Sequence, residues 1–167
     1  GSRLSTFDKS SIRAFRFVRC SFDAETGGAR LVYAFDEGPE LTETVTIPGA
    51  PFALDATRAQ AVALAVRLLH LITGVSYYKA AVPGEIRIDS YTIDGCGIEA
   101  AAAVVVGQVY VHGLGEFAYR NGLSLHGRVR FPVAAQAPAP AAAAGLREHA
   151  LAAIGGGKDS LVSIEAL

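Results

Sequence analysis

The first indication of the fold class comes from the stretch FRFVRCSFDAETGGARLVYAFDEGPELTETVTI, residues 15–47. Three successive runs in it alternate apolar side chains with other residues, which is the period of a half-buried β-strand. The apolar positions of these runs are Phe15, Phe17, Leu31, Tyr33, Phe35, Leu41, Val45 and Ile47. Turn-forming residues separate the runs, in DAETGG (residues 23–28) and DEGPE (residues 36–40). Strands joined by such short turns predict an antiparallel β-meander.

A helix is expected directly after the meander. Apolar residues recur at helical spacing within residues 57–72, which predicts an amphipathic helix; they are Val62, Leu64, Ala65, Leu68, Leu69 and Ile72. Thr57 and Gln60 fit a capping box at its start, and Gly74 is a natural stop at its end.

Shorter elements are expected further along the chain. Residues 74–84 (GVSYYKAAVPG) contain Pro and Gly and fit no period, so they predict a loop, followed by a short strand at residues 85–89. A second helical stretch is expected over residues 98–122, broken near its glycines at positions 113 and 115. Residues 128–131 are a candidate for one more strand.

The composition changes at residue 131, and this predicts the domain organisation. We expect an N-terminal α+β domain over residues 1–131 and a semi-rigid Ala/Pro linker over residues 132–145. Residues 146–167 then resemble the first βα unit of a second, α/β domain. One strand and one helical turn cannot bury themselves, so we expect the second domain to be truncated in this chain. The fold class is therefore α+β, a β-meander with helices followed by the start of a PP-loop type domain.

Charge and cysteine content exclude several function classes. The net charge of −1 and the scattered cationic residues provide no electrostatic surface for nucleic acid. No uninterrupted apolar run reaches the roughly 18–20 residues of a membrane span, so no membrane partner is expected. Cys20 and Cys96 match no zinc spacing. With no secretory signal visible, we expect a cytoplasmic protein.

The stretch IGGGKDSLVS (residues 154–163) has the composition of a phosphate-binding turn between a strand and a helix. Backbone N–H groups at such a helix N-terminus favour an anion, and glycine lets the backbone approach it closely. Lys158 adds a positive charge, Asp159 is suited to hold Mg²⁺, and Ser160 supplies a hydroxyl. The stretch lacks both the Walker A and the G-x-G-x-x-G spacings. A glycine turn used only for packing is the less favoured alternative.

That stretch resembles the PP-loop of the ATP pyrophosphatases, Ser-Gly-Gly-x-Asp-Ser. Gly155 stands where the family has its first serine, while Gly156, Gly157, Asp159 and Ser160 match. The resemblance implies that these residues, with Lys158, bind the phosphates of ATP.

Two further groups of polar residues are candidate site residues. His112, Glu116, Tyr119 and Arg120 fall near one helix face and are suited to acid–base work and carboxylate binding. In the segment SYYK, residues 76–79, Tyr77, Tyr78 and Lys79 offer aromatic surface and an ammonium group. For both groups the plain alternative is structural, with half-buried rings and solvated charges.

Several blocks taken together resemble one family, the UDP-N-acetylmuramoyl-L-alanyl-L-glutamate epimerases of peptidoglycan precursor synthesis. The blocks are FDKSSIRAFRFVRC, YAFDEGPEL, SYYKAAVP, VHGLGEFAYRNGL, RVRFP and IGGGKDSLVS. The resemblance implies an isomerase that inverts the terminal L-Glu of its UDP-muramoyl dipeptide through an acyl-adenylate. It would consume ATP with Mg²⁺ and release AMP and pyrophosphate.

The block resemblance and residue chemistry then suggest a role for each candidate. His112 and Glu116 become the candidates for proton transfer, and Tyr77, Tyr78, Lys79, Tyr119 and Arg120 the candidates for substrate binding. The 167-residue chain alone is expected to be inactive and to depend on the remainder of the enzyme.

Two alternatives to the epimerase stay open. One is another PP-loop adenylating enzyme, although a thiolating or amide-forming type would favour catalytic cysteines that this chain lacks. The other is an α+β binding module whose glycine turn is only structural.

Overall fold

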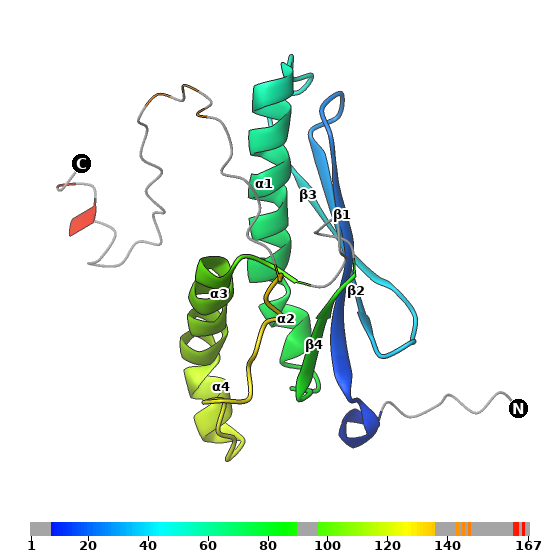
Figure 1. The fold of residues 1–167 in the computed structure, drawn as a ribbon, viewed down its shortest axis with the longest axis vertical. Coiled ribbons are helices and arrows are strands. Elements are labelled where there is room, and N and C mark those ends of the chain that lie inside the picture. Colours follow the sequence, from blue (N-terminus) through cyan, green and yellow to red (C-terminus); the bar gives the residue numbers. More distant parts are fainter. Residues whose placement is uncertain are drawn as a thin grey trace, which may run out of the picture.

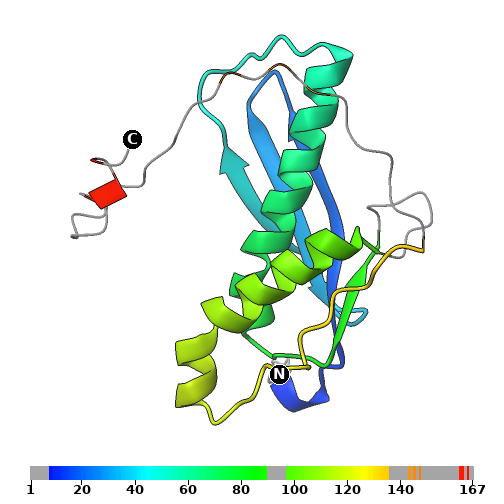
Figure 2. The ribbon, with the colours of Figure 1, turned by 60° about the vertical axis from the view of Figure 1, so that its left-hand side comes forward.

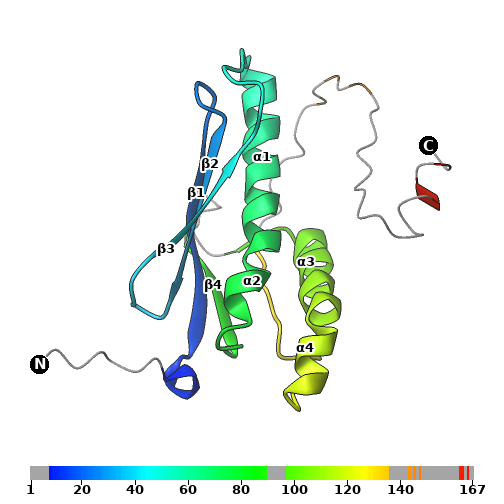
Figure 3. The same ribbon diagram turned by 180° about the vertical axis from the view of Figure 1, so that it is seen from behind.

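The computed structural model describes residues 8–89 and 97–135, together with the isolated positions 143, 145, 147, 162, 163 and 165. The described chain forms one four-stranded sheet with its helices on one face (Figures 1 and 3). A single-turn 3₁₀ helix, η1 (Lys9–Ser11), precedes the sheet. The fold class is therefore α+β, as predicted.

The predicted meander is confirmed. Strands β1 (Ala14–Asp23), β2 (Gly28–Phe35) and β3 (Leu41–Thr46) pair in an antiparallel fashion. Gly27 is required in the first turn because its φ is +73° and a Cβ there would lie 2.3 Å from the carbonyl oxygen of Ile47. Alternation in β1 buries Phe15 and Phe17 on one face and helps to fix the register. In β2, residues 31–34 are all buried.

Strand β4 (Glu85–Ile88) adds a feature that the local pattern does not contain. The strand itself lies where it was predicted, but it pairs in parallel with β1, at the edge of the sheet. The strand order is β3-β2-β1-β4, so the sheet is mixed. A parallel neighbour needs a long crossover, and here residues 47–84 supply it with helices on one face of the sheet.

Helix α1 (Ala56–Thr73) forms as predicted but starts differently. Its N-cap is Asp55, whose carboxylate accepts the N–H of Arg58 at 2.8 Å, so the Thr57–Gln60 capping box is wrong. Gly74 ends α1 as expected, yet its φ of −55° is ordinary. Glycine is needed there for space, since a Cβ would lie 2.6 Å from the Phe17 ring and 2.7 Å from the Tyr110 hydroxyl.

The buried face of α1 differs from the apolar stripe in the sequence. Val66, His70 and Leu71 are buried, whereas three members of the stripe lie exposed, namely Leu64, Leu68 and Ile72. Apolar residues surround most of this helix, and periodicity then cannot select the face that meets the sheet.

The second half of the helical layer is shorter and more broken. Helix α2 (Val75–Tyr78) occupies part of the segment predicted to be a loop. Helices α3 (Ala100–Gly113) and α4 (Gly115–Arg120) confirm the predicted helical stretch and its break. The candidate strand at residues 128–131 is wrong. The only pairing near it among the described residues is an isolated parallel bridge between Ile98 and Val133.

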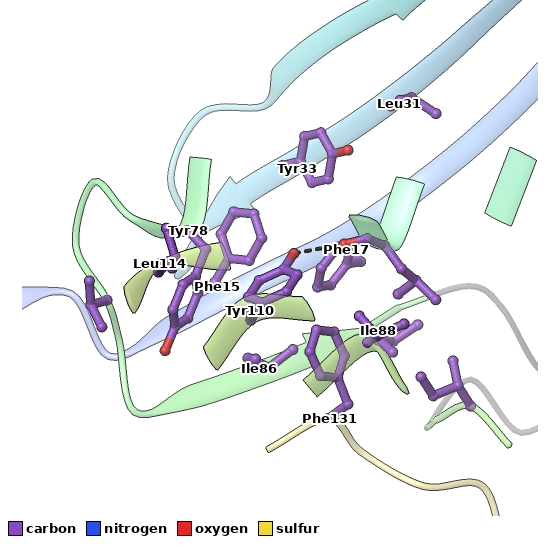
Figure 4. Packing of buried hydrophobic residues seen from close by; sticks show 14 of the residues in the cluster. Phe15, Phe17, Leu31, Tyr33, Tyr78, Ile86, Ile88, Tyr110, Leu114 and Phe131 are labelled. Carbon is purple, nitrogen blue, oxygen red and sulfur yellow. Dashed lines mark hydrogen bonds between the residues drawn. The ribbon is translucent and has the colours of Figure 1, made fainter. Parts of the chain in front are cut away.

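An aromatic cluster fills the space between sheet and helices (Figure 4). Phe15 meets Phe17 edge-on with ring centroids 5.1 Å apart, and the Tyr78 ring meets Tyr110 at 5.4 Å. Offset and edge-on ring pairs of this kind stabilise the core beyond the contribution of the apolar area that they bury. Figure 2 shows α3 crossing the C-terminal end of α1. There the Tyr110 hydroxyl, which belongs to the cluster, donates to the carbonyl oxygen of Leu71.

Helices α1 and α2 form a nearly continuous helix over Ala56–Tyr78, of 23 residues with a mean hydropathy of 1.5. By length and composition alone it is long and apolar enough to cross a membrane. Arg67 and His70 interrupt its apolar sequence, so the helix contains no uninterrupted apolar run of membrane-spanning length. Mostly buried core helices meet the same criterion; this helix packs on the sheet along one side, and 22% of its apolar window is buried.

The linker and the start of the second domain fall almost entirely outside the described residues. The domain boundaries at residues 131 and 145 therefore stay predictions.

Candidate functional site

An open groove of about 530 Å³ lies where the first and last described elements meet. It brings together the 3₁₀ turn η1, the end of α2 and the junction of α3 with α4. The residues that line it are Lys9, Lys79, Ala80, Gly113, Leu114, Glu116, Phe117 and Asn121. Two of the predicted site residues, Lys79 and Glu116, thus share one groove although 37 positions separate them in the sequence.

The groove carries two ammonium groups that are available to an anion. Within the described ranges, neither Lys9 nor Lys79 takes part in an ion pair. Asn121 donates its side-chain N–H to the carbonyl oxygen of Phe117 at 2.8 Å, which holds the amide at the groove wall. Two lysines and an amide suit phosphate or carboxylate oxygens.

Glu116 and Arg120 form one unit on α4. The guanidinium of Arg120 lies 2.8 Å from the Glu116 carboxylate, one helical turn away, and both side chains are exposed. An exposed pair of this kind contributes little to stability. Glu116 lines the groove, whereas Arg120 lies outside the lining.

His112 lies on α3 outside the groove lining. Its Nε2 is 2.7 Å from the side-chain oxygen of Gln108, one turn earlier. Because that oxygen only accepts, Nε2 carries the proton and Nδ1 is the basic nitrogen. Tyr119 is 88% exposed and also lies outside the lining. The predicted row of four residues is thus interrupted at the α3–α4 junction, and of its members only Glu116 lines the groove.

The three consecutive residues 77–79 have separate surroundings. Tyr78 is fully buried, with its hydroxyl donating to the carbonyl oxygen of Pro83 at 3.0 Å, and burial raises the pKa of its phenol. Tyr77 donates to the Glu43 carboxylate at 2.8 Å, and this hydrogen bond raises its pKa. Both tyrosines therefore hold the fold together, as the structural alternative has it. Lys79 alone faces the groove.

Six of the lining residues were not predicted from the sequence, and the polar ones among them are Lys9 and Asn121. Lys9 stands in the block FDKSSIRAFRFVRC and Asn121 in VHGLGEFAYRNGL, so both lie inside the stretches that carry the family resemblance. No local spacing relates them, because more than a hundred residues separate the two. Only the tertiary structure, which places both residues in the lining of one groove, shows that they belong together.

His70 is the one buried polar side chain in the described core. Its Nε2 donates to the carbonyl oxygen of Val32 at 2.9 Å, and burial lowers its pKa to about 4. The ring also packs against Tyr33, with centroids 4.5 Å apart. This histidine links α1 to β2 through that hydrogen bond and does not line the groove.

The phosphate-loop candidates Gly155, Gly156, Gly157, Lys158, Asp159 and Ser160 lie outside the described residues. In the part of the chain that is described, no group of three or more His, Cys, Asp or Glu side chains could hold a metal ion. The ATP and Mg²⁺ assignments therefore rest on the donor chemistry of residues 155–160.

The fold and groove define an α+β domain with an open groove lined by two lysines, one glutamate and one asparagine. The family described as "MurL N-terminal domain" matches residues 6–167, which is nearly the whole chain. The chain belongs to this family.

Curated relatives agree with that membership. The UDP-N-acetyl-alpha-D-muramoyl-L-alanyl-L-glutamate epimerase of Xanthomonas oryzae pv. oryzae (strain MAFF 311018) is 69% identical over 98% of this chain. A protein of the same name from Salinispora tropica is 37% identical over 92% of the chain. The matches cover 35% and 33% of those relatives, so the chain spans about a third of their length. No solved structure matches the chain.

Proposed function

We propose that this chain is the N-terminal part of an enzyme that epimerises the terminal L-Glu of UDP-N-acetylmuramoyl-L-alanyl-L-glutamate to D-Glu. The observation that carries the proposal is the 69% identity, over 98% of the chain, to a relative named as this epimerase. We expect the enzyme to act in the cytoplasm, where a nucleotide-linked substrate and ATP would be found.

The chemistry of epimerisation explains why such an enzyme would need ATP. A free carboxylate makes the neighbouring Cα–H a very weak acid, because deprotonation puts a second negative charge beside the first. We propose that a carboxylate oxygen attacks the α-phosphorus of ATP and displaces pyrophosphate. The neutralised acyl group then acidifies the Cα–H, a base removes that proton, and one returns to the opposite face. Water finally releases AMP and the D-Glu product.

The groove offers this chain's own contribution. Lys9 and Lys79 would bind anionic oxygens of the substrate, either its diphosphate or its carboxylates, and Arg120 would bind a carboxylate after parting from Glu116. Glu116 and the Nδ1 of His112 are the candidates for moving the Cα proton. Residues 155–160 would bind the phosphates of ATP, with Asp159 holding Mg²⁺.

The test uses the complete enzyme with Mg-ATP and UDP-N-acetylmuramoyl-L-alanyl-L-glutamate. We expect AMP release together with D-Glu in the recovered peptide, and loss of both in Asp159→Ala. AMP without inversion would favour another adenylating enzyme and overturn the epimerase. No AMP would favour the binding module. The 167-residue chain by itself is expected to release none.

A further inference from the structure

Helix α1 presents an apolar stripe to the outside of the described domain. Leu64, Leu68 and Ile72 follow one another at four-residue spacing and are 42%, 46% and 38% exposed. Only two charged side chains, Arg58 and Arg67, occur in residues 56–78. A solvated helix face normally carries charges, and their depletion is typical of a surface that becomes covered.

A second exposed apolar group lies on α3, the helix that crosses α1. Val104 and Val105 are 64% and 58% exposed, and α3 carries no charged side chain at all. The hydroxyl of Tyr110 donates to the Leu71 carbonyl oxygen at 2.8 Å, which brings α3 against the end of the stripe (Figure 2). We call Leu64, Leu68, Ile72, Val104 and Val105 together the outer helical patch.

The last continuously described residues lie near the start of α3. Val133 forms a bridge with Ile98, two residues before α3 begins, and is itself 53% exposed. About two thirds of the length of the full relatives lies outside the part that this N-terminal domain matches. A region tethered so close to an apolar surface reaches it at high effective concentration.

We propose that the outer helical patch is the docking surface for the region that follows residue 135 in the complete enzyme. The proposal rests on the family membership and the exposed side chains, and it holds whether or not the proposed reaction is correct. Docking there would place the following region against α1 and α3 and so hold it at a defined position relative to the groove.

Hydrogen bonds to the sheet argue against α1 spanning a membrane. His70 donates to the Val32 carbonyl oxygen at 2.9 Å, and the Tyr33 hydroxyl donates to the His70 carbonyl oxygen at 2.9 Å. Both bonds are buried. Helix α1 would have to break them, and expose the aromatic core below, in order to span a bilayer.

Thiol labelling of the complete enzyme tests the proposal without reference to activity. Cys20, Cys96 and any further native cysteines are first replaced by alanine. Leu68→Cys then reports on the patch, and Thr44→Cys is the matched control, since Thr44 lies exposed on β3 on the face of the sheet that carries no helix. The labelling rate of each variant in the native enzyme is divided by its rate in urea, which corrects for the intrinsic reactivity of the thiol.

We expect native labelling of Leu68→Cys to be at least about tenfold slower than that of Thr44→Cys. Equal rates would overturn the proposal. Protection that appears only as protein concentration rises would assign the patch to a second copy of the chain, and protection that appears only with anionic phospholipid vesicles would assign it to a membrane; both overturn it. Leu64→Cys repeats the test in case Leu68→Cys does not fold.

Discussion

The hydroxyl of Tyr110 on α3 donates a hydrogen bond of 2.8 Å to the carbonyl oxygen of Leu71 in the last turn of α1. The same ring meets Tyr78 and Phe131 edge-on, with centroids 5.4 and 5.1 Å away. Helix α3 leads into α4, which lines the groove. The orientation of this one buried ring therefore helps to set where Glu116 lies relative to Lys79.

Tyr110→Phe should lower the free energy of unfolding by about 1 kcal/mol, the usual net value of one buried hydrogen bond. Urea denaturation of this chain measures it. Tyr119→Phe is the matched control, because that ring is 88% exposed. Equal effects of the two substitutions would show that the buried bond contributes nothing.

Gly74→Ala should destabilise the domain by about 1–3 kcal/mol, because the new methyl group would overlap the Phe17 ring and the Tyr110 hydroxyl. Gly107→Ala is the opposite case. That glycine lies inside α3 with open space around the position of a Cβ, so alanine should stabilise by about 0.5–1 kcal/mol. Thermal unfolding measures the change in melting temperature of each variant. A rise for Gly74→Ala would contradict the close packing around Gly74, and a fall for Gly107→Ala would contradict the open space beside α3.

Stability should fall as the pH drops from 6.5 to 4, on account of His70. Burial holds its pKa at about 4, below the ordinary 6.5. Between these values the unfolded chain binds a proton that the folded one does not, so acid favours unfolding. The loss should reach about 3 kcal/mol by pH 4.

The variant His70→Gln keeps a donor for the Val32 carbonyl but does not titrate. The stability gap between wild type and His70→Gln should therefore narrow as the pH is lowered from 7 to 4. Urea titrations at several pH values measure this gap. A gap that stays constant would mean that His70 titrates alike in the folded and unfolded chains.

Lys79→Ala and Lys9→Ala should each raise the KM for the UDP-muramoyl dipeptide in the complete enzyme by about tenfold and leave kcat nearly unchanged, as expected when a charge aids binding alone. Steady-state AMP release measures both constants. Arg30→Ala serves as the control, because Arg30 is exposed on β2 and lies outside the groove lining. A fall in kcat with constant KM would instead assign the lysines to the chemical step.

Local pattern predicted much of the fold, and its failures have a common cause. The meander follows from alternation and turn chemistry, and the α3–α4 break follows from two glycines close together in the sequence. The cap of α1 was misplaced because Asp55 and Thr57 are both good capping residues and only the backbone decides between them. The buried face of α1 was misplaced because apolar residues surround it.

The candidate site was predicted in part. Lys79 and Glu116 were selected for their chemistry and do line one groove. Tyr77 and Tyr78 were selected by the same argument, yet one hydroxyl binds Glu43 and the other is buried against Pro83. A tyrosine in the core and one at a binding site have the same local sequence properties, and only packing distinguishes them.

The sequence by itself determined the α+β class, the antiparallel meander and the family, because alternation, turn residues and shared blocks are all properties of neighbouring residues. Tertiary structure alone decided that β4 lies parallel to β1, that α1 buries His70 and exposes Leu68, and that Lys9 meets Lys79 in one groove. Each of these depends on how segments far apart in the chain pack against one another and exclude water from their contact. No short stretch of sequence contains that information.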